Sequence, residues 1–270
     1  MTVPPNRFFA LTFSLSWLIW IPLALSHFGI GPLHISAGTS HLVRLLGVLM
    51  PAASALILTA RTGGRGALRG LFSRLTHWRV GWQWWLAAVV VQPALLCLAA
   101  LAFNLISSSS KVSLQPLTSV SAFVVNVVIL LIATLGEEFG WRGVALPGLQ
   151  ERNSAFTSSV ILGLLWAAWH VPFWLLLDSF DQFGAGYLFL NALFVFPLTF
   201  YITWFFNHSR QSLLLPVLFH LTFNIVNTVL LPVTIHIGAF AIFGVLEWTA
   251  AFLVLPHLES KPVHAAPSST

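Results

Sequence analysis

Eight apolar runs, separated by short polar breaks, limit what this chain can fold into. A transmembrane helix needs about 20 mostly apolar residues to cross the hydrocarbon core, and it satisfies its backbone polar groups without water. Only 7% of the residues are charged, against about 25% in soluble domains. The sequence therefore predicts an all-α, polytopic transmembrane bundle of about eight membrane-spanning helices. The runs cover residues 8–28, 42–60, 82–106, 119–147, 155–177, 187–206, 213–233 and 237–256.

The chain shows no internal repeat and no second domain. Residues 1–256 are expected to form a single transmembrane domain, with the first apolar run retained as a span. Residues 257–270 contain several Pro and Ser residues and are expected to be a disordered cytoplasmic tail. The single cysteine, Cys97, lies in an apolar run and excludes an internal disulfide.

The basic residues indicate the orientation in the membrane. With eight spans both termini lie on one side, and this side carries ten of the 12 Lys and Arg residues, five of them within 61–79. The other side carries Arg44 and Lys111, with Asp178 and Asp181. Cytoplasmic loops hold the excess of Lys and Arg, so both termini are predicted to be cytoplasmic, and nucleic acid is not an expected partner. Segment 61–79 is expected to be either an amphipathic helix on anionic headgroups or a plain basic loop.

Three charged residues stand inside the fourth apolar run, in the stretch LGEEFGWRG: Glu137, Glu138 and Arg142. Each costs about 2.5–3.5 kcal/mol at the centre of a span unless it is compensated. Glu138 and Arg142 are about 40° apart on a helix, in the favourable order with the acid first. Glu137 points about 100° away from Glu138 and has no local partner. We therefore expect Glu138 to be paired and Glu137 to be available for chemistry, with a purely structural ion cluster as the alternative.

Two further polar pairs occur at helical spacing in apolar runs. Trp166 and His170 share one face of the fifth run, and His220 and Asn224 share one face of the seventh. The midpoint between Glu137 and His170 falls in the polar break QERNS, so these residues lie at similar depth on antiparallel neighbouring helices. A cavity open to the cytoplasm is the expected setting for Glu137, His170, His220 and Asn224, although a buried histidine alone is more often structural.

The three motifs together resemble those of one family of intramembrane proteases. EEFGWR matches E-E-x-x-x-R, WAAWH matches the second motif, usually F-x-x-x-H, and HLTFN matches H-x-x-x-N/D, all in the family's order. The family is the CAAX-protease and bacteriocin-processing (CPBP) family, also called Abi or type II CAAX prenyl endopeptidases. The resemblance covers about residues 119–230. Trp166 stands where Phe is usual, which is expected to preserve an aromatic wall while reshaping the substrate pocket.

The resemblance implies an eight-helix endopeptidase with a water-filled, cytoplasm-facing cavity. Its substrate would be a membrane-associated protein or peptide, cut near a CAAX-type C terminus or within a leader. Glu137 would be the general base, and His170 would help to position and deprotonate water. His220 and Asn224 would donate to the tetrahedral oxyanion. The supporting residues would be Glu138, Arg142 and Trp166.

The sequence leaves the question of a metal open. Glu137, His170 and His220 form a His2Glu zinc set, which a water would complete to four ligands. Family members are often classed as metalloproteases. Asn224 is a poor zinc ligand and a good oxyanion donor, so a metal-free glutamate mechanism is favoured, with Zn²⁺ as the alternative.

Two other classes of function are compatible with polar residues in lipid. A proton-coupled transporter uses such relays, but the internal repeats and paired broken helices typical of transporters are missing. A non-catalytic immunity or scaffold protein would not need the complete motif set. The expected partners are the lipid bilayer and a membrane-associated substrate. The compact chain, without an ER signal or large soluble insertions, favours a bacterial plasma membrane.

Overall fold

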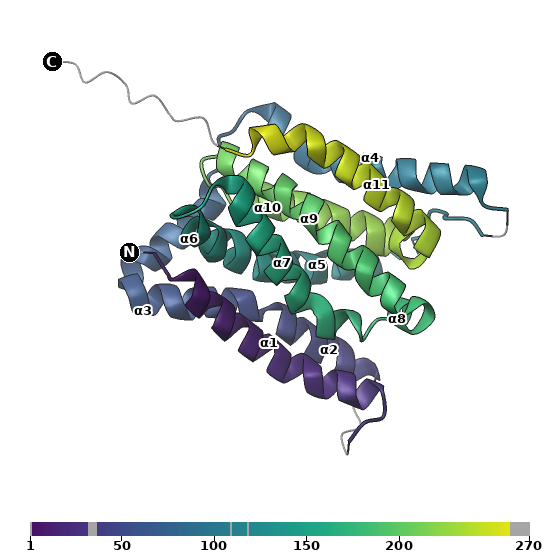
Figure 1. Cartoon of the computed structure of the whole chain (residues 1–270), viewed down its shortest axis with the longest axis horizontal. Coiled ribbons are helices and arrows are strands. Elements are labelled where there is room, and N and C mark those ends of the chain that lie inside the picture. Colours follow the sequence, from purple (N-terminus) through teal and green to yellow (C-terminus); the bar gives the residue numbers. More distant parts are fainter. Residues whose placement is uncertain (1, 32–36, 109, 118, 260–270) are drawn as a thin grey trace.

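The computed structural model describes residues 2–31, 37–108, 110–117 and 119–259. Every regular element in these ranges is a helix, which confirms the all-α prediction (Figure 1). Within them, seven helical stretches are long and apolar enough to cross a membrane, and Leu214–Leu230 is a shorter apolar helix. These eight stretches coincide with the eight apolar runs of the sequence. Most of the predicted tail, residues 260–270, lies outside the described residues.

Most of the elements follow one another with short connections. Their bounds are α1 (Pro5–His27), α2 (Ala37–Val48), α3 (Met50–Ser73), η1 (Arg74–Thr76), α4 (Trp82–Ile106), α5 (Val120–Gly140), η2 (Trp141–Ala145), α6 (Leu146–Gln150), α7 (Ala155–Trp174), α8 (Asp178–Phe183), α9 (Ala185–His208), α10 (Leu214–Ile225), η3 (Val226–Leu230), η4 (Val233–Ile235), α11 (Ile237–Val254) and η5 (Leu255–His257). Two of the short elements, η2 and η3, are single π-helical turns that directly follow α5 and α10. Such turns are rare and frequently occur at functional sites.

The basic segment 61–79 is largely helical. Helix α3 continues through it to Ser73, with a kink at Gly64, whose φ is 62°. Of the two alternatives for this segment, the structure therefore gives a helix that ends in the turn η1, followed by a short irregular stretch before α4.

Two glycines that flank the glutamate pair let α5 approach the α2–α3 junction closely. A Cβ atom on Gly140 would lie 2.5 Å from the Cβ and 2.8 Å from the carbonyl oxygen of Pro51. A Cβ atom on Gly136 would lie 2.7 Å from a methyl carbon of Leu49. Small residues four apart bring membrane helices into backbone contact. This contact fixes the position of Glu137 and Glu138 against the neighbouring helix.

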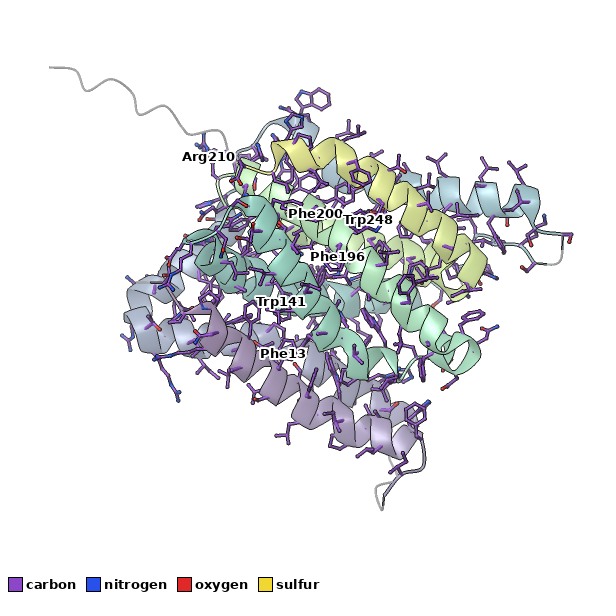
Figure 2. The ribbon with its side chains drawn as sticks, viewed as in Figure 1. Phe13, Trp141, Phe196, Phe200, Arg210 and Trp248 are labelled. Atoms are coloured by element: carbon purple, nitrogen blue, oxygen red, sulfur yellow. The ribbon has the colours of Figure 1, made fainter. Side chains whose placement is uncertain are left out.

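Aromatic side chains fill the contacts between the helices. Trp141 of η2 packs edge-on against Phe8 of α1 and Trp169 of α7, with ring centroids 5.4 and 5.3 Å apart. Trp248 of α11 lies against Phe196 of α9, with ring centroids 6.3 Å apart (Figure 2). Because Trp141 is fully buried, it holds the π-helical turn after Glu137 and Glu138 to two other helices.

Both ends of the described chain lie at one end of the bundle. The backbone N–H of Ala155 donates to the Glu259 carboxylate at 2.7 Å, and Gly148 contacts Pro5. The basic segment is at the same end, because Arg74 donates to the carbonyl of Gly143 at 2.9 Å. In Figure 1 the N terminus, α6 and the end of α3 lie together at the left.

The opposite end of the bundle holds α8 and the connections on either side of it. His27, at the end of α1, lies 3.1 Å from Asp181 of α8. The backbone N–H of Gln115 donates to the carbonyl of Leu230 at 2.8 Å. In Figure 1 this end lies at the right, where α8 is labelled.

Candidate active site

A cavity of about 520 Å³ brings the predicted site residues together. Its wall is formed mainly by α5, α7, α9 and α10. The predicted catalytic residues on its lining are Glu137, His170, His220 and Asn224, and Trp166 joins them. The remaining supporting residues, Glu138 and Arg142, are fully buried behind this wall.

The lack of a partner on its own helix suggested that Glu137 would be free, but its carboxylate has a partner on α7. Its Oε2 accepts a hydrogen bond of 2.8 Å from the indole Nε1 of Trp166. The same oxygen lies 3.7 Å from Nε2 of His170, which is too long for a direct hydrogen bond. His170 donates through Nδ1 to the carbonyl of Trp166 at 2.8 Å. In the neutral ring Nε2 is therefore an acceptor, and one water can bridge it to the carboxylate.

Trp166 lines the cavity, as the sequence predicted, and it also contacts two charged side chains. Its indole N–H orients the Glu137 carboxylate, and its ring face lies 4.4 Å from the guanidinium carbon of Arg142. A phenylalanine at this position could form the wall but not the hydrogen bond. Having Trp166 instead of the usual phenylalanine therefore gives Glu137 a hydrogen bond that phenylalanine could not provide.

Glu138 accepts hydrogen bonds from two side chains that belong to different elements. Its Oε1 accepts from Nη1 of Arg142 at 3.1 Å, as the spacing predicted, and from Nδ1 of His220 at 2.8 Å. The second contact was not predicted, because helix spacing shows partners on one helix only. The carboxylate thus fixes the ring of His220 and leaves its Nε2 as the free ring nitrogen.

Asn224 has a partner on α5 that the sequence analysis missed. Its side-chain Nδ2 donates to Oγ1 of Thr134 at 3.2 Å. Thr134 is fully buried and lies three residues before Glu137, so helical spacing could have placed it on the same face. This contact uses one of the two hydrogens on the Asn224 amide nitrogen and leaves the other for a ligand.

The rest of the cavity wall is mostly apolar, with a smaller set of polar residues. Aromatic and aliphatic residues of the wall include Leu130, Phe173, Leu177, Phe194 and Phe223. The polar residues farther along it are Asp178, Ser179, Asn227, Thr228 and Thr234. A polypeptide held by its apolar side chains, with its backbone near Glu137, fits this distribution.

The cavity extends toward the end of the bundle opposite the termini. The lining includes Asp178, Ser179, Thr234 and Ile235, and it includes no residue of 150–154 or 207–213. The sequence analysis expected both cytoplasmic termini and a cytoplasm-open cavity. The lining extends toward the end of the bundle opposite the termini, and the side of the membrane that each end faces stays a prediction.

The candidate zinc ligands do not form a metal site in this arrangement. Among the described residues, no group of three His, Cys, Asp or Glu side chains is placed so that it could hold a metal ion. Nδ1 of His170 and Nδ1 of His220 are both used in hydrogen bonds within the protein. These hydrogen bonds leave Nε2 of both rings unused, as in a metal-ligating histidine, so the choice between a metal-free mechanism and Zn²⁺ stays a prediction.

A second buried carboxyl group lies outside the candidate site. Glu247 of α11 is fully buried beside Gln92 of α4, and it does not line the cavity. Tyr201 donates to its backbone carbonyl at 2.9 Å. Because it lies outside the cavity, it is not placed to act on a substrate held there.

Comparison with known proteins supports the resemblance that the motifs indicated. The family model for Type II CAAX prenyl endopeptidase Rce1-like matches residues 118–226, which contain the whole candidate site. The chain is also 28% identical over 241 residues to a protein named CAAX prenyl protease 2 from Methanococcus maripaludis, covering 85% of this chain and 86% of that protein. With its apolar helices, the chain is an integral, multi-pass membrane protein. The matches confirm the resemblance that the three motifs indicated: residues 118–226 are similar to the Rce1-like type II CAAX prenyl endopeptidases.

Proposed function

We propose that this protein is an intramembrane endopeptidase in which Glu137 activates water to hydrolyse a peptide bond of a membrane-associated protein or peptide. The observation that carries this proposal is the 3.7 Å separation of the Glu137 carboxylate and His170 Nε2 on the wall of the cavity. The protease family of the matching model supports the reaction class.

The attacking water would lie between these two acceptors. A water that donates one hydrogen to Glu137 and the other to His170 directs its oxygen lone pair away from both, toward a substrate carbonyl. As the oxygen attacks the carbonyl carbon, Glu137 takes its proton, and the carbonyl becomes a tetrahedral oxyanion. Glu137 then gives this proton to the departing amine when the C–N bond breaks. Trp166 keeps the carboxylate oriented throughout.

His220 and Asn224 would stabilise the oxyanion. The amide hydrogen of Asn224 that Thr134 does not use is available to donate to it. His220 donates through Nδ1 to Glu138, so its Nε2 can donate only when the ring carries both hydrogens. In that state the formal charges of Glu137, Glu138, Arg142 and His220 sum to zero.

None of these steps uses a metal. The proposed mechanism is a metal-free glutamate mechanism, and His170 positions the water rather than binding a metal. If zinc took part, removing it with a chelator would abolish cleavage. We expect the activity of the purified protein to persist in a chelator.

Membrane-proteome peptide profiling tests the proposal in cells. Cells with the wild-type protein should contain cleaved products that disappear in cells with Glu137→Ala at equal protein levels. Glu151→Ala is the matched control, because Glu151 is an exposed residue outside the cavity. Identical product sets in wild type and Glu137→Ala would overturn the proposal.

A further inference from the structure

A pocket of about 340 Å³ lies at the end of the bundle that holds the termini, and we propose that it binds the phosphate group of an anionic phospholipid headgroup. Residues 76–80, which run from η1 toward α4, and residues 209–210, which follow α9, line this arginine pocket. Asn207, near the end of α9, donates to the carbonyl of Leu258 at 2.9 Å, and Figure 2 shows Arg210 at the left edge of the bundle. None of the lining residues belongs to the cavity that holds Glu137, so the proposal is independent of the proposed protease function.

The two arginines of this pocket carry charges that the protein does not neutralise. Arg79 and Arg210 both line it, and the described lining contains no Asp or Glu. Among the residues that the structure describes, neither guanidinium forms an ion pair. By contrast, Arg44, Arg74 and Lys111 each donate to backbone carbonyls. Arginine presents planar N–H donors that match the oxygens of a phosphate group, so two unpaired guanidiniums in one pocket favour a phosphate ligand.

Hydrogen bonds join the two segments that form the walls of the arginine pocket. The backbone N–H of Leu213 donates to the carbonyl of Arg74 at 3.0 Å. Nδ1 of His77 donates to the carbonyl of Arg210 at 3.1 Å, because a carbonyl oxygen can only accept. These bonds tie the segment after α9 to the segment before α4. A ligand therefore meets a preformed site, and little of its binding energy is needed to order the walls.

Arg210 stands in a backbone conformation that is unusual for its residue type. It and Gln211 have φ angles of 56° and 57°, and in the described chain they are the only residues other than glycine with a positive φ. At the end of a helix this conformation usually belongs to Gly or Asn. The N–H of Gln211 donates to the carbonyl of Phe206 at 3.0 Å, which satisfies the end of α9. Glycine would serve this turn with less strain, so an arginine at this position indicates a role for its side chain.

The position of the pocket along the bundle favours a lipid over a soluble phosphate compound. The first lining segment ends two residues before α4 begins at Trp82, and the second starts directly after α9 ends at His208. Both helices are long and apolar enough to cross a membrane. Trp78 and Trp82 are exposed, and tryptophan is enriched at the level of the headgroups. The ring of Trp78 lies 5.4 Å from the guanidinium carbon of Arg79, which holds this cation at the same depth.

Titration of the purified, full-length protein in detergent with short-chain phosphatidylglycerol tests the site, with binding followed by native mass spectrometry. Arg79→Gln/Arg210→Gln removes both positive charges of the pocket. We expect its Kd for phosphatidylglycerol to rise at least about tenfold, because each basic residue near an anionic lipid contributes about fivefold in affinity. Its unfolding temperature should stay close to that of the wild type, because neither guanidinium is in an ion pair of the described structure.

Arg7→Gln/Arg152→Gln is the matched control. It removes the same charge from exposed residues outside the pocket. Its Kd should change by less than about threefold at 0.15 M salt, where charges farther away than about 8 Å are screened. Equal weakening in both double variants would overturn the site, because only the overall charge would then matter. Phosphatidylcholine or inorganic phosphate that binds as tightly as phosphatidylglycerol would overturn the assignment to an anionic lipid.

Arg210→Gly separates binding from stability. Glycine relaxes the positive φ at this position, so the unfolding temperature should not fall. The loss of the cation should raise the Kd for phosphatidylglycerol at least about threefold. An unchanged Kd, or a fall in stability together with the loss of binding, would overturn the role of Arg210 in the site.

Discussion

The indole nitrogen of Trp166 lies 2.8 Å from Oε2 of Glu137 and joins α7 to the glutamate of α5. The same tryptophan accepts, through its backbone carbonyl, the Nδ1 hydrogen of His170. One residue therefore orients both groups between which the attacking water is proposed to lie. The buried Arg142 guanidinium rests on the face of the same ring.

Replacing Trp166 with phenylalanine should separate these roles. Trp166→Phe keeps an aromatic wall but removes a hydrogen bond to a charged group, which contributes about 1.5–3 kcal/mol. We expect kcat to fall about 10- to 100-fold with little change in KM, because the lost contact holds the catalytic carboxylate rather than the substrate. Steady-state kinetics of the purified protein measure both constants.

Trp248→Phe is the matched control for this change. Trp248 also donates through its indole nitrogen, to the carbonyl of Leu193 at 3.1 Å, but it does not line the cavity. Equal losses of kcat in both variants would show that Trp166 acts only through general stability.

Amide substitution of the two adjacent glutamates should affect the stability of the protein differently. Glu138→Gln leaves Arg142 fully buried without its carboxylate partner and weakens the bond to His220. Breaking one side of a buried ion pair costs about 3–5 kcal/mol, so its thermal unfolding temperature should fall. Glu137→Gln should keep its unfolding temperature close to that of the wild type. Thermal unfolding in detergent distinguishes them, and a larger loss in Glu137→Gln would contradict the assignment of Glu138 as the structural partner.

The close approach of α5 to the α2–α3 junction should make Gly140 intolerant of a side chain. Gly140→Ala places a methyl group against the backbone of Pro51, and such overpacking costs about 1–3 kcal/mol. Gly70→Ala, in helix α3, meets no atom within 4 Å and should be neutral or stabilising. Their unfolding temperatures provide the test, and equal temperatures would mean that the junction relaxes around the added methyl group.

The cavity wall makes a prediction about the substrate's C terminus. Its described lining contains no lysine or arginine, so a terminal carboxylate would have no fixed cation as its partner. We expect amidation of a peptide substrate's C terminus to change kcat/KM by less than about threefold, whereas losing a charged hydrogen bond would cost at least about tenfold. A large loss on amidation would instead indicate recognition of a CAAX-type free C terminus.

The sequence predicted the helices, and it named residues that the structure brings together on one cavity wall, because both depend on patterns along the chain. Hydropathy located all eight helical stretches, and helical spacing paired Glu138 with Arg142. Counting outward from the QERNS loop placed Glu137 and His170 at the same depth, and they are neighbours in the structure.

Contacts between helices could not be predicted in the same way. The bonds from Trp166 to Glu137 and from His220 to Glu138 depend on how each helix is rotated about its axis, which spacing on one helix does not determine. The direction of the cavity likewise depends on which helix ends splay apart. The expectations of cytoplasmic termini and of a cytoplasm-open cavity stay predictions.

The central claim, that Glu137 activates the attacking water, is tested most directly by the cleavage rate of purified Glu137→Gln. The amide keeps the shape of the side chain and can still accept from Trp166, but it cannot take a proton from water. General-base catalysis contributes about 10²–10⁴-fold, so kcat should fall by at least about 100-fold, in buffer with or without a chelator. A Glu137→Gln protein that is folded and cleaves at the wild-type rate would contradict the account.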